Sequence, residues 1–381
     1  MKFDSKLPNT GTTIFTVMSA LAAEYGAINL AQGFPSYSSS PKLINLVSRY
    51  MEKGYNQYAP MAGLPALRKI LAEKYNRTHG ISLDPDEEIT VLAGATQGLF
   101  TAISTVIRPG DEVILIEPAY DSYRPSVEVN GGVPVVYETR PPDYRVNWAD
   151  FGRLITPKTR MVIINTPHNP TGKTLDAADM AALANLLEGT DILVLSDEVY
   201  EHLIYDGRRH TGVLSHPGLR DRSFAVYSFG KTFHNTGWKI GYCIAPPLLT
   251  REFRKVHQFN VFSVNTPMQW ALAEFLEDPE EYLQLPEFYR RKRDFFSNAM
   301  QESALKPLTC EGTYFQLFSY GHLSDEPDTG FARRLTIEYG VAAIPVSVFY
   351  SNGMDERIIR LCFAKDEEIL AEGARRLARL G

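Results

Sequence analysis

Short runs of consecutive apolar residues recur along the chain, each followed by polar residues, glycine or proline. Six runs share this form, and they cover residues 88–93, 112–116, 133–137, 161–164, 192–195 and 224–227. Consecutive apolar side chains predict strands that are covered on both faces, because neighbouring side chains of a strand point to opposite sides. Segments with helical spacing, such as 98–106 and 177–187, lie between the runs. This alternation predicts an α/β fold in which helices cover a mostly parallel sheet.

Two parts of the chain depart from the alternation. Residues 1–40 are irregular and rich in glycine, proline and serine. In the last hundred residues the charge density rises, and helices are interleaved with strands at 313–318 and 358–363. We therefore predict a large domain at 41–280, and a smaller α+β domain in which residues 281–381 are joined by the N-terminal arm.

The composition narrows the class of protein. The chain has 381 residues, of which 44% are hydrophobic, so it can bury a substantial core. The net charge is −6 and no basic stripe is present, so neither composition nor charge indicates a nucleic-acid partner. No apolar run reaches the length of about 18 residues that a membrane span needs. The three cysteines, Cys243, Cys310 and Cys362, form no CxxC pair, which favours a reduced, cytoplasmic compartment and no cysteine metal site.

Chemically rich loops follow five of the predicted strands. They cover residues 94–98, 117–121, 165–172, 196–200 and 228–232. Open parallel sheets bind ligands beyond the carboxyl ends of their strands, so we expect these loops to meet at one edge of the sheet. Five such loops at one edge indicate a functional site.

The first of these loops has the form of an anion site. Gly94 allows a tight turn after a strand, and the helix that follows would present backbone N–H groups near Ala95 and Thr96. Such a site suits a phosphate, although an ordinary strand-to-helix turn has the same pattern. The loop lacks the Lys-Ser/Thr ending of a P-loop and the GxGxxG of a dinucleotide site, which disfavours a nucleotide.

A lysine follows the last of the five strands on a glycine turn. This turn can direct Lys231 back into a cleft, where desolvation and nearby cations would lower the pKa of its amine. An uncharged amine can form a Schiff base and carry a proton. Ser228 and Lys239 are close enough in sequence to reach the same phosphate. The alternative is an ordinary lysine exposed to solvent.

Asp197 ends an apparently buried strand, and a buried charge needs a partner. The N–H of a protonated pyridine ring is one such partner, and the pairing would let the ring accept electrons. Tyr200 and Asn169 could donate to a ring oxygen on the same side, and Tyr120 could stack on the ring face. The alternative for Asp197 is a helix N-cap.

An arginine interrupts the apolar strand at 358–361. Burial of Arg360 is costly unless its guanidinium meets an anion, and its planar fork suits a bidentate grip on a carboxylate. A salt bridge within the protein is the competing interpretation.

The order of these motifs resembles a known family. The motifs are Asn-Pro-x-Gly at 169–172, Asp-Glu-x-Tyr at 197–200, Ser-x-Gly-Lys at 228–231 and the late strand arginine. Together they resemble the class I/II aminotransferases of pyridoxal-phosphate fold type I, over nearly the whole chain. Within that family the chain is similar to the branch of kynurenine, glutamine and methionine aminotransferases, with the bacterial methionine enzymes most alike. The resemblance implies a large domain with a mostly parallel seven-stranded sheet and a smaller α+β domain.

The resemblance also implies a cofactor, pyridoxal 5'-phosphate, and a role for each motif. Lys231 would be the Schiff-base lysine, and Asp197 the partner of the pyridine nitrogen. The ring oxygen would be bound by Asn169 and Tyr200, and Tyr120 would stack on the ring. The phosphate would be held by Gly94, Ala95, Thr96, Ser228 and Lys239.

Further residues are implied for the substrate and the partner subunit. Arg360, Asn169 and the backbone of Gly33 would fix the substrate carboxylate. Tyr58 would reach the phosphate bound by the neighbouring subunit, which implies a homodimer. His168, directly before Asn169, has no role that the resemblance supplies.

The implied activity is a ping-pong transfer of an amino group from methionine, glutamine or an aromatic amino acid to a 2-oxo acid. Two alternatives stay open: a cysteine-S-conjugate β-lyase of the same fold, and a non-catalytic cofactor-binding regulator. The regulator is disfavoured because the chain has no basic appendage. No second arginine is evident for a side-chain carboxylate, which disfavours aspartate and glutamate as donors. The expected lining of the substrate pocket is Ile14, Phe15, Tyr37, Tyr58, Tyr120 and Phe262.

Overall fold

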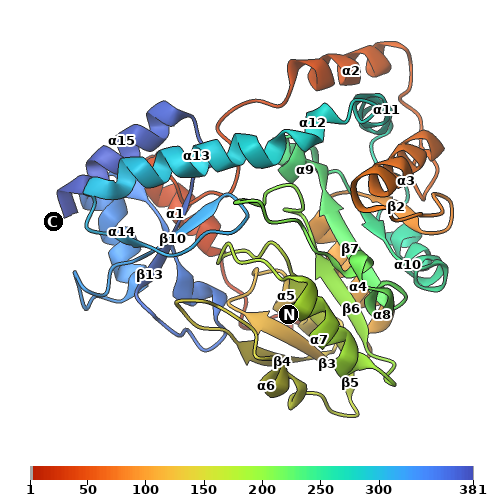
Figure 1. Ribbon diagram of the computed structural model, residues 1–381, viewed down its shortest axis with the longest axis horizontal. Coiled ribbons are helices and arrows are strands. Elements are labelled where there is room, and N and C mark those ends of the chain that lie inside the picture. Colours follow the sequence, from red (N-terminus) through yellow and green to blue (C-terminus); the bar gives the residue numbers. More distant parts are fainter. Residues whose placement is uncertain (1–2, 381) are drawn as a thin grey trace.

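The computed structural model describes residues 3–380 and is built around a large sheet, a smaller antiparallel sheet and their covering helices (Figure 1). The seven strands of the large sheet are β2 (Ile89–Leu92), β3 (Glu112–Glu117), β4 (Val133–Glu138), β5 (Thr159–Asn165), β6 (Leu193–Asp197), β7 (Ser223–Ser228) and β8 (Gly241–Ile244). Their spatial order is β2-β8-β7-β6-β5-β3-β4. All neighbours are parallel except β8, which is antiparallel to β2 and β7. The predicted mostly parallel α/β sheet is confirmed, and each of the six apolar runs forms one of its strands.

Helices cover both faces of this sheet because its strands are apolar on both sides. In β3, Val113 and Leu115 pack in a core with α4 and α10, whereas Ile114 lies in a second core with α3 and α7. The helices of this part are α2 (Pro41–Glu52), α3 (Pro65–His79), α4 (Ala95–Val106), α5 (Tyr123–Val129), α6 (Trp148–Gly152), α7 (Ala177–Leu187), α8 (Pro217–Arg220), α9 (Phe229–Thr232), α10 (Pro247–Asn260), α11 (Thr266–Phe275) and α12 (Glu280–Leu283).

The two helices expected from spacing are present. The one predicted at 177–187 has those bounds, and Asp176 caps it by accepting hydrogen bonds from the backbone of Ala178 and Asp179. The one predicted at 98–106 begins earlier, at Ala95. Gly94, at φ +87°, turns the chain so sharply after β2 that the helix starts at once.

The smaller sheet lies beside the large one, at the left of Figure 1. Its antiparallel strands follow the order β12 (Ile344–Pro345), β13 (Ile358–Cys362), β10 (Phe315–Ser319) and β9 (Lys306–Pro307). A separate parallel pair joins β1 (Ile28–Asn29) to β11 (Val341–Ala342). The helices here are α1 (Ile14–Glu24), α13 (Leu285–Ala299), α14 (Asp328–Glu338) and α15 (Glu367–Leu377). Short 3₁₀ helices occur at Val213–Ser215, Thr236–Trp238, Met300–Glu302, Val346–Phe349 and Ala378–Leu380.

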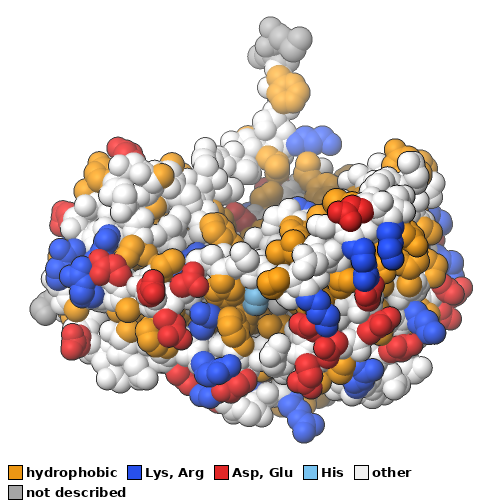
Figure 2. Space-filling model, turned by 90° about the horizontal axis from the view of Figure 1, so that it is seen from above, with side chains coloured by type: hydrophobic (Ala, Val, Ile, Leu, Met, Phe, Trp, Pro, Cys, Tyr) orange, Lys and Arg blue, Asp and Glu red, His pale blue; other side chains and the backbone are white. Residues whose placement is uncertain are grey.

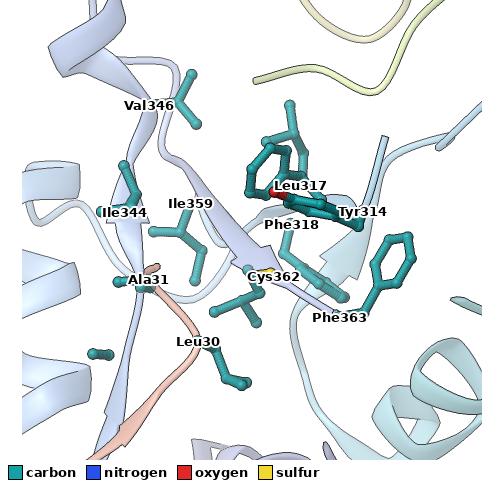
Figure 3. Close-up of a cluster of buried hydrophobic side chains, with 14 of the residues drawn as sticks. Leu30, Ala31, Tyr314, Leu317, Phe318, Ile344, Val346, Ile359, Cys362 and Phe363 are labelled. Atoms are coloured by element: carbon teal, nitrogen blue, oxygen red, sulfur yellow. The ribbon is translucent and has the colours of Figure 1, made fainter. Parts of the chain in front are cut away.

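One hydrophobic core joins the N-terminal segment to the C-terminal part. Leu30 and Ala31 lie against the strands that carry Ile344 and Ile359, and Cys362 lies between them and the aromatic residues of the neighbouring strand (Figure 3). The boundaries of the two domains, 41–280 against 1–40 and 281–381, stay a prediction.

The surface carries charges of both signs. On the face seen in Figure 2, acidic and basic side chains are intermingled. Among residues 3–380, no helix is long and apolar enough to cross a membrane.

Candidate active site

The loops after the parallel strands meet at a cavity of about 210 Å³, which the smaller sheet closes from the other side. Eleven of the predicted site residues line it: Gly33, Ala95, Thr96, Tyr120, Asn169, Asp197, Tyr200, Ser228, Lys231, Lys239 and Arg360. Gly94 lies at its edge, because a Cβ on that glycine would be 3.4 Å from Lys239 Nζ. Residues more than 250 positions apart in sequence therefore face one space.

One end of the cavity is suited to an anion. Helix α4 begins here, and Gly94 at its N-cap has no side chain to occupy the first amide groups. Lys239, whose own backbone is left-handed at φ +55°, brings its ammonium group to the same place. Ser228 and Thr96 line this end as well. A phosphate here would meet a helix N-terminus and a cation together.

Lys231 is partly buried at the cavity wall and is bonded to neutral groups. Its Nζ donates to the Tyr314 hydroxyl oxygen at 2.9 Å and to the Gly33 carbonyl oxygen at 3.2 Å. Burial lowers the pKa of this amine to about 8, and the nearby cations Arg360 and Lys239 act in the same direction. The alternative of a solvent-exposed lysine is wrong, and about a tenth of the amine is uncharged at pH 7.

Asp197 is a buried carboxylate at the end of β6. It accepts hydrogen bonds from the Tyr123 hydroxyl at 2.7 Å and from the backbone N–H of Val199 at 3.3 Å. No lysine or arginine within the described chain forms an ion pair with it. Burial raises the pKa of this carboxyl to about 6. The segment after Asp197 is a turn, so the helix N-cap alternative is wrong.

Arg360, in the middle of β13, is fully buried and has no carboxylate partner among the described residues. Its guanidinium donates to Asn169 Oδ1 at 2.7 Å and to the Ala31 carbonyl oxygen at 3.2 Å. The Nε atom has no hydrogen-bond partner in residues 3–380. The Phe315 ring lies 3.8 Å from the guanidinium carbon. Burial lowers the pKa of this group to about 10, so it is still charged at neutral pH. The salt-bridge alternative is wrong, and a cation with an unmet donor faces the cavity.

Asp197, Lys231 and the anion site at the start of α4 fit pyridoxal phosphate. Within residues 3–380, the buried carboxylate of Asp197 has no cation, the partly buried Lys231 has no anion, and the start of α4 together with Lys239 has no anionic partner. A protonated pyridine ring, an aldehyde and a phosphate would supply what each position lacks.

Some predicted residues lie away from the cavity. Phe15 and Tyr120 line it, as expected of the substrate pocket, but Ile14, Tyr37, Tyr58 and Phe262 do not. Tyr37 packs at the edge of the His234 ring. Tyr58 is 81% exposed and contacts the ring of Phe262, which is itself 52% exposed.

His168 faces away from the cavity. Its Nδ1 is 2.7 Å from Thr171 Oγ1, and its ring is hydrogen-bonded to the backbone of Pro118. Burial lowers the pKa of this imidazole to about 4, so the ring is neutral. It therefore ties its own loop to the loop that precedes Tyr120.

Among the residues missed from the sequence, Tyr123 bonds to Asp197 and Tyr314 bonds to Lys231. Tyr123, the first residue of α5, comes three positions after Tyr120, so its distance in sequence was a usable signal. Tyr314 directly precedes β10, and only the tertiary structure brings it to Lys231.

The fold and this cavity are those of a known enzyme class. The family model for aminotransferase class I and II matches residues 25–377, and the chain belongs to that family. It is an aminotransferase, and members of the family use pyridoxal phosphate. The predicted family, fold type and enzyme class are confirmed.

Several characterised proteins are similar over their full length. The methionine aminotransferase of Escherichia coli (strain K12) is 51% identical over 377 residues, covering 99% of this chain and 98% of that protein. The crystal structure of YbdL from Escherichia coli, described as having a methionine aminotransferase function, has a TM-score of 0.98 at 50% identity and full coverage of both chains. The kynurenine–oxoglutarate transaminase 1 of Mus musculus is 34% identical, covering 94% of this chain and 92% of that protein.

Proposed function

We propose that the chain transfers the amino group of methionine, glutamine or an aromatic amino acid to a 2-oxo acid by a ping-pong mechanism, with Lys231 as the catalytic residue. The observation that carries the proposal is a lysine with a lowered pKa at the wall of the cavity that also holds a buried carboxylate and a buried arginine, which meets no anion within residues 3–380. The similarity to methionine and kynurenine aminotransferases supports the choice of donors.

Each group around the cavity has a proposed part in holding pyridoxal phosphate. Asp197 would pair with the ring nitrogen, Asn169 and Tyr200 would donate to the ring oxygen, and Tyr120 would stack on the ring. The phosphate would be bound by Gly94, Ala95, Thr96, Ser228 and Lys239. When bound, the cofactor supplies an electron sink for the pair of electrons left when a proton leaves the substrate Cα.

Lys231 is the proposed proton carrier. Its Nζ, uncharged in part near neutral pH, takes the proton from Cα and holds it as an ammonium group. The substrate and cofactor, when bound, would cover this amine and slow the exchange of the proton with water.

Arg360 is the proposed anchor of the substrate. Its unpartnered Nε and the backbone of Gly33 would bind the α-carboxylate, and the amide nitrogen of Asn169 would add a donor. Phe15 and Phe315 provide an apolar wall. Arg360 is the only arginine lining the cavity in the described structure, which supports donors with uncharged side chains.

We also propose a cytoplasmic homodimer with the site at the subunit interface. The exposed Tyr58 would contact the phosphate in the partner subunit, as the exposed pair of Tyr58 and Phe262 suggests. The three buried free cysteines suit a reducing compartment. Sedimentation analysis should give a dimer, and Tyr58→Phe should weaken cofactor binding.

The decisive experiment is covalent trapping. The purified protein should become coloured with pyridoxal phosphate, and borohydride should fix the cofactor to the peptide that contains Lys231. A panel of amino donors with 2-oxo acids should then show a preference for methionine, glutamine or aromatic donors. A colourless protein would contradict the proposal. Stoichiometric pyruvate and ammonia without an acceptor would favour the β-lyase instead.

A further inference from the structure

In the part of the chain that the structure describes, the amine of Lys231 has one side-chain partner within hydrogen-bond distance, Tyr314. We propose that Tyr314 is a positioning residue that holds this amine in place whenever it is not bonded to the cofactor, and that links its position to the Gly33 loop. The inference rests on the proposed function, because it assigns a role to Tyr314 in the step for which Lys231 must be free.

The directions of the hydrogen bonds are fixed by the groups involved. The Tyr314 hydroxyl donates to the Gly33 carbonyl oxygen at 2.6 Å, so its single proton is already used. The oxygen can therefore only accept from Lys231 Nζ, which is 2.9 Å away. A neutral amine has two N–H bonds, and Tyr314 and Gly33 accept both. The lone pair is then the one position left at the nitrogen, and it is free to take a proton.

A phenol suits this position better than a carboxylate would. Burial raises the pKa of the Tyr314 hydroxyl well above its usual range, so the group stays neutral. A neutral acceptor orients the amine without the strong preference for the ammonium form that a buried anion would impose.

The surroundings keep the phenol from moving. Tyr314 is fully buried, and its ring packs against the edges of Tyr200 and Phe315 at centroid distances of 5.2 and 4.9 Å. Its carbonyl oxygen accepts from the backbone N–H of Phe363. On the other side, a Cβ on Gly33 would lie 2.7 Å from the Phe315 ring, so this loop is packed closely as well. Figure 3 shows Tyr314 within a cluster of buried hydrophobic side chains, beside Leu317 and Phe318.

The link to Gly33 gives the contact a second consequence. The backbone of Gly33 is proposed to bind the substrate carboxylate, and its carbonyl oxygen is bonded to both Tyr314 and Lys231. Loss of the Tyr314 hydroxyl would therefore disturb mainly the position of the Lys231 amine and, to a lesser extent, the carboxylate site at Gly33.

The test is Tyr314→Phe, with Tyr320→Phe as the matched control. Tyr320 is also fully buried and also donates to a carbonyl oxygen, that of Glu326 at 2.7 Å, but it lies outside the cavity. Both variants should lose similar, small amounts of thermal stability. In single turnover with methionine, Tyr314→Phe should be slower by about 10- to 100-fold, the loss expected for one hydrogen bond to a charged group. In steady-state kinetics, its KM for methionine should change less. Tyr320→Phe should react at the wild-type rate.

A second measurement uses the protein without cofactor. The rate at which it binds pyridoxal phosphate covalently depends on the fraction of Lys231 that is uncharged, so the pH profile of this rate reports the pKa of the amine. Tyr314→Phe removes an acceptor that favours the ammonium form, and its profile should shift to lower pH by about one unit. Tyr320→Phe should leave the profile unchanged.

The inference would be overturned by a Tyr314→Phe variant with the wild-type rate and pH profile, or by an equal loss of single-turnover rate in Tyr314→Phe and Tyr320→Phe. Failure of the proposed function is a separate outcome, since the wild-type protein itself would then not bind the cofactor at Lys231.

Discussion

Two lysines away from the outer surface, the buried Lys74 and the partly buried Lys231, lie in different regions of the molecule and have opposite surroundings. Lys74, on α3, is 2.7 Å from Glu201 Oε1 and donates to the Tyr242 hydroxyl at 3.0 Å. Lys231 has only neutral oxygens as hydrogen-bond partners in the described structure. Burial lowers the pKa of both amines, but at Lys74 the adjacent carboxylate acts against that effect.

The two acids next to these lysines differ in the same way. Although burial alone would raise it, the pKa of Glu201 is held well below its usual range, chiefly by Lys74. The pKa of Asp197, with no such partner, is raised to about 6. Lys74 and Glu201 neutralise each other within the fold, whereas Lys231 and Asp197 form no ion pair among the described residues and are left to bind a ligand.

The largest effect is expected at the unpaired lysine. Lys231→Ala should slow transamination by about 10⁴-fold, at the upper end of what a proton carrier contributes. It should also abolish borohydride trapping, while the unfolding free energy should not fall, because no ion pair is lost. Stopped-flow spectra with methionine and urea unfolding measure both. A variant that completes the half-reaction at the wild-type rate without added amine would remove Lys231 from the mechanism.

The paired lysine should show the opposite behaviour. Lys74→Met leaves Glu201 charged and buried, which should cost about 3–5 kcal/mol of unfolding free energy in urea. The double variant Lys74→Met with Glu201→Gln should recover part of the loss. If the single variant were as stable as the wild type, the ion pair would not be the stabilising feature.

A pH-dependent effect is expected at Asp197 in the protein without cofactor. Its folded-state pKa is raised from 3.8 to about 6, so the stability that it contributes is complete below pH 4 and is lost as the pH rises through 6. Cofactor-free Asp197→Asn should therefore gain about 3 kcal/mol relative to the wild type between pH 4 and pH 7. Urea unfolding at four pH values in this range tests this. A stability difference that does not change with pH would show that the carboxyl does not titrate in this range.

The smallest effect is expected at the substrate anchor. Arg360→Lys keeps the charge but loses the planar fork, so KM for methionine should rise about tenfold, equivalent to about 1.4 kcal/mol. The kcat value should change less, because Lys231 and Asp197 are untouched. Steady-state kinetics separate the two, and an unchanged KM would place the carboxylate elsewhere.

Local pattern was sufficient for much of the fold. The strands from β2 to β7 are runs in which both faces are apolar, and α7 has the predicted bounds. The strand β8 was missed because it has only four residues, including Gly241, and is not part of a longer apolar run. The two-residue strands β1, β9, β11 and β12 have no signal of their own, since they exist only through their pairing.

The sequence by itself determined the sheet, the family and the residue types of the site, because motifs at strand ends are local and the carboxyl ends of parallel strands must share an edge. The tertiary structure alone decided what each charged group meets. Arg360, 191 positions after Asn169, has no carboxylate partner in the described structure, and Tyr314 meets Lys231 from a segment 83 positions away. Burial and the choice of partner set a pKa, and both depend on contacts between residues far apart in the chain.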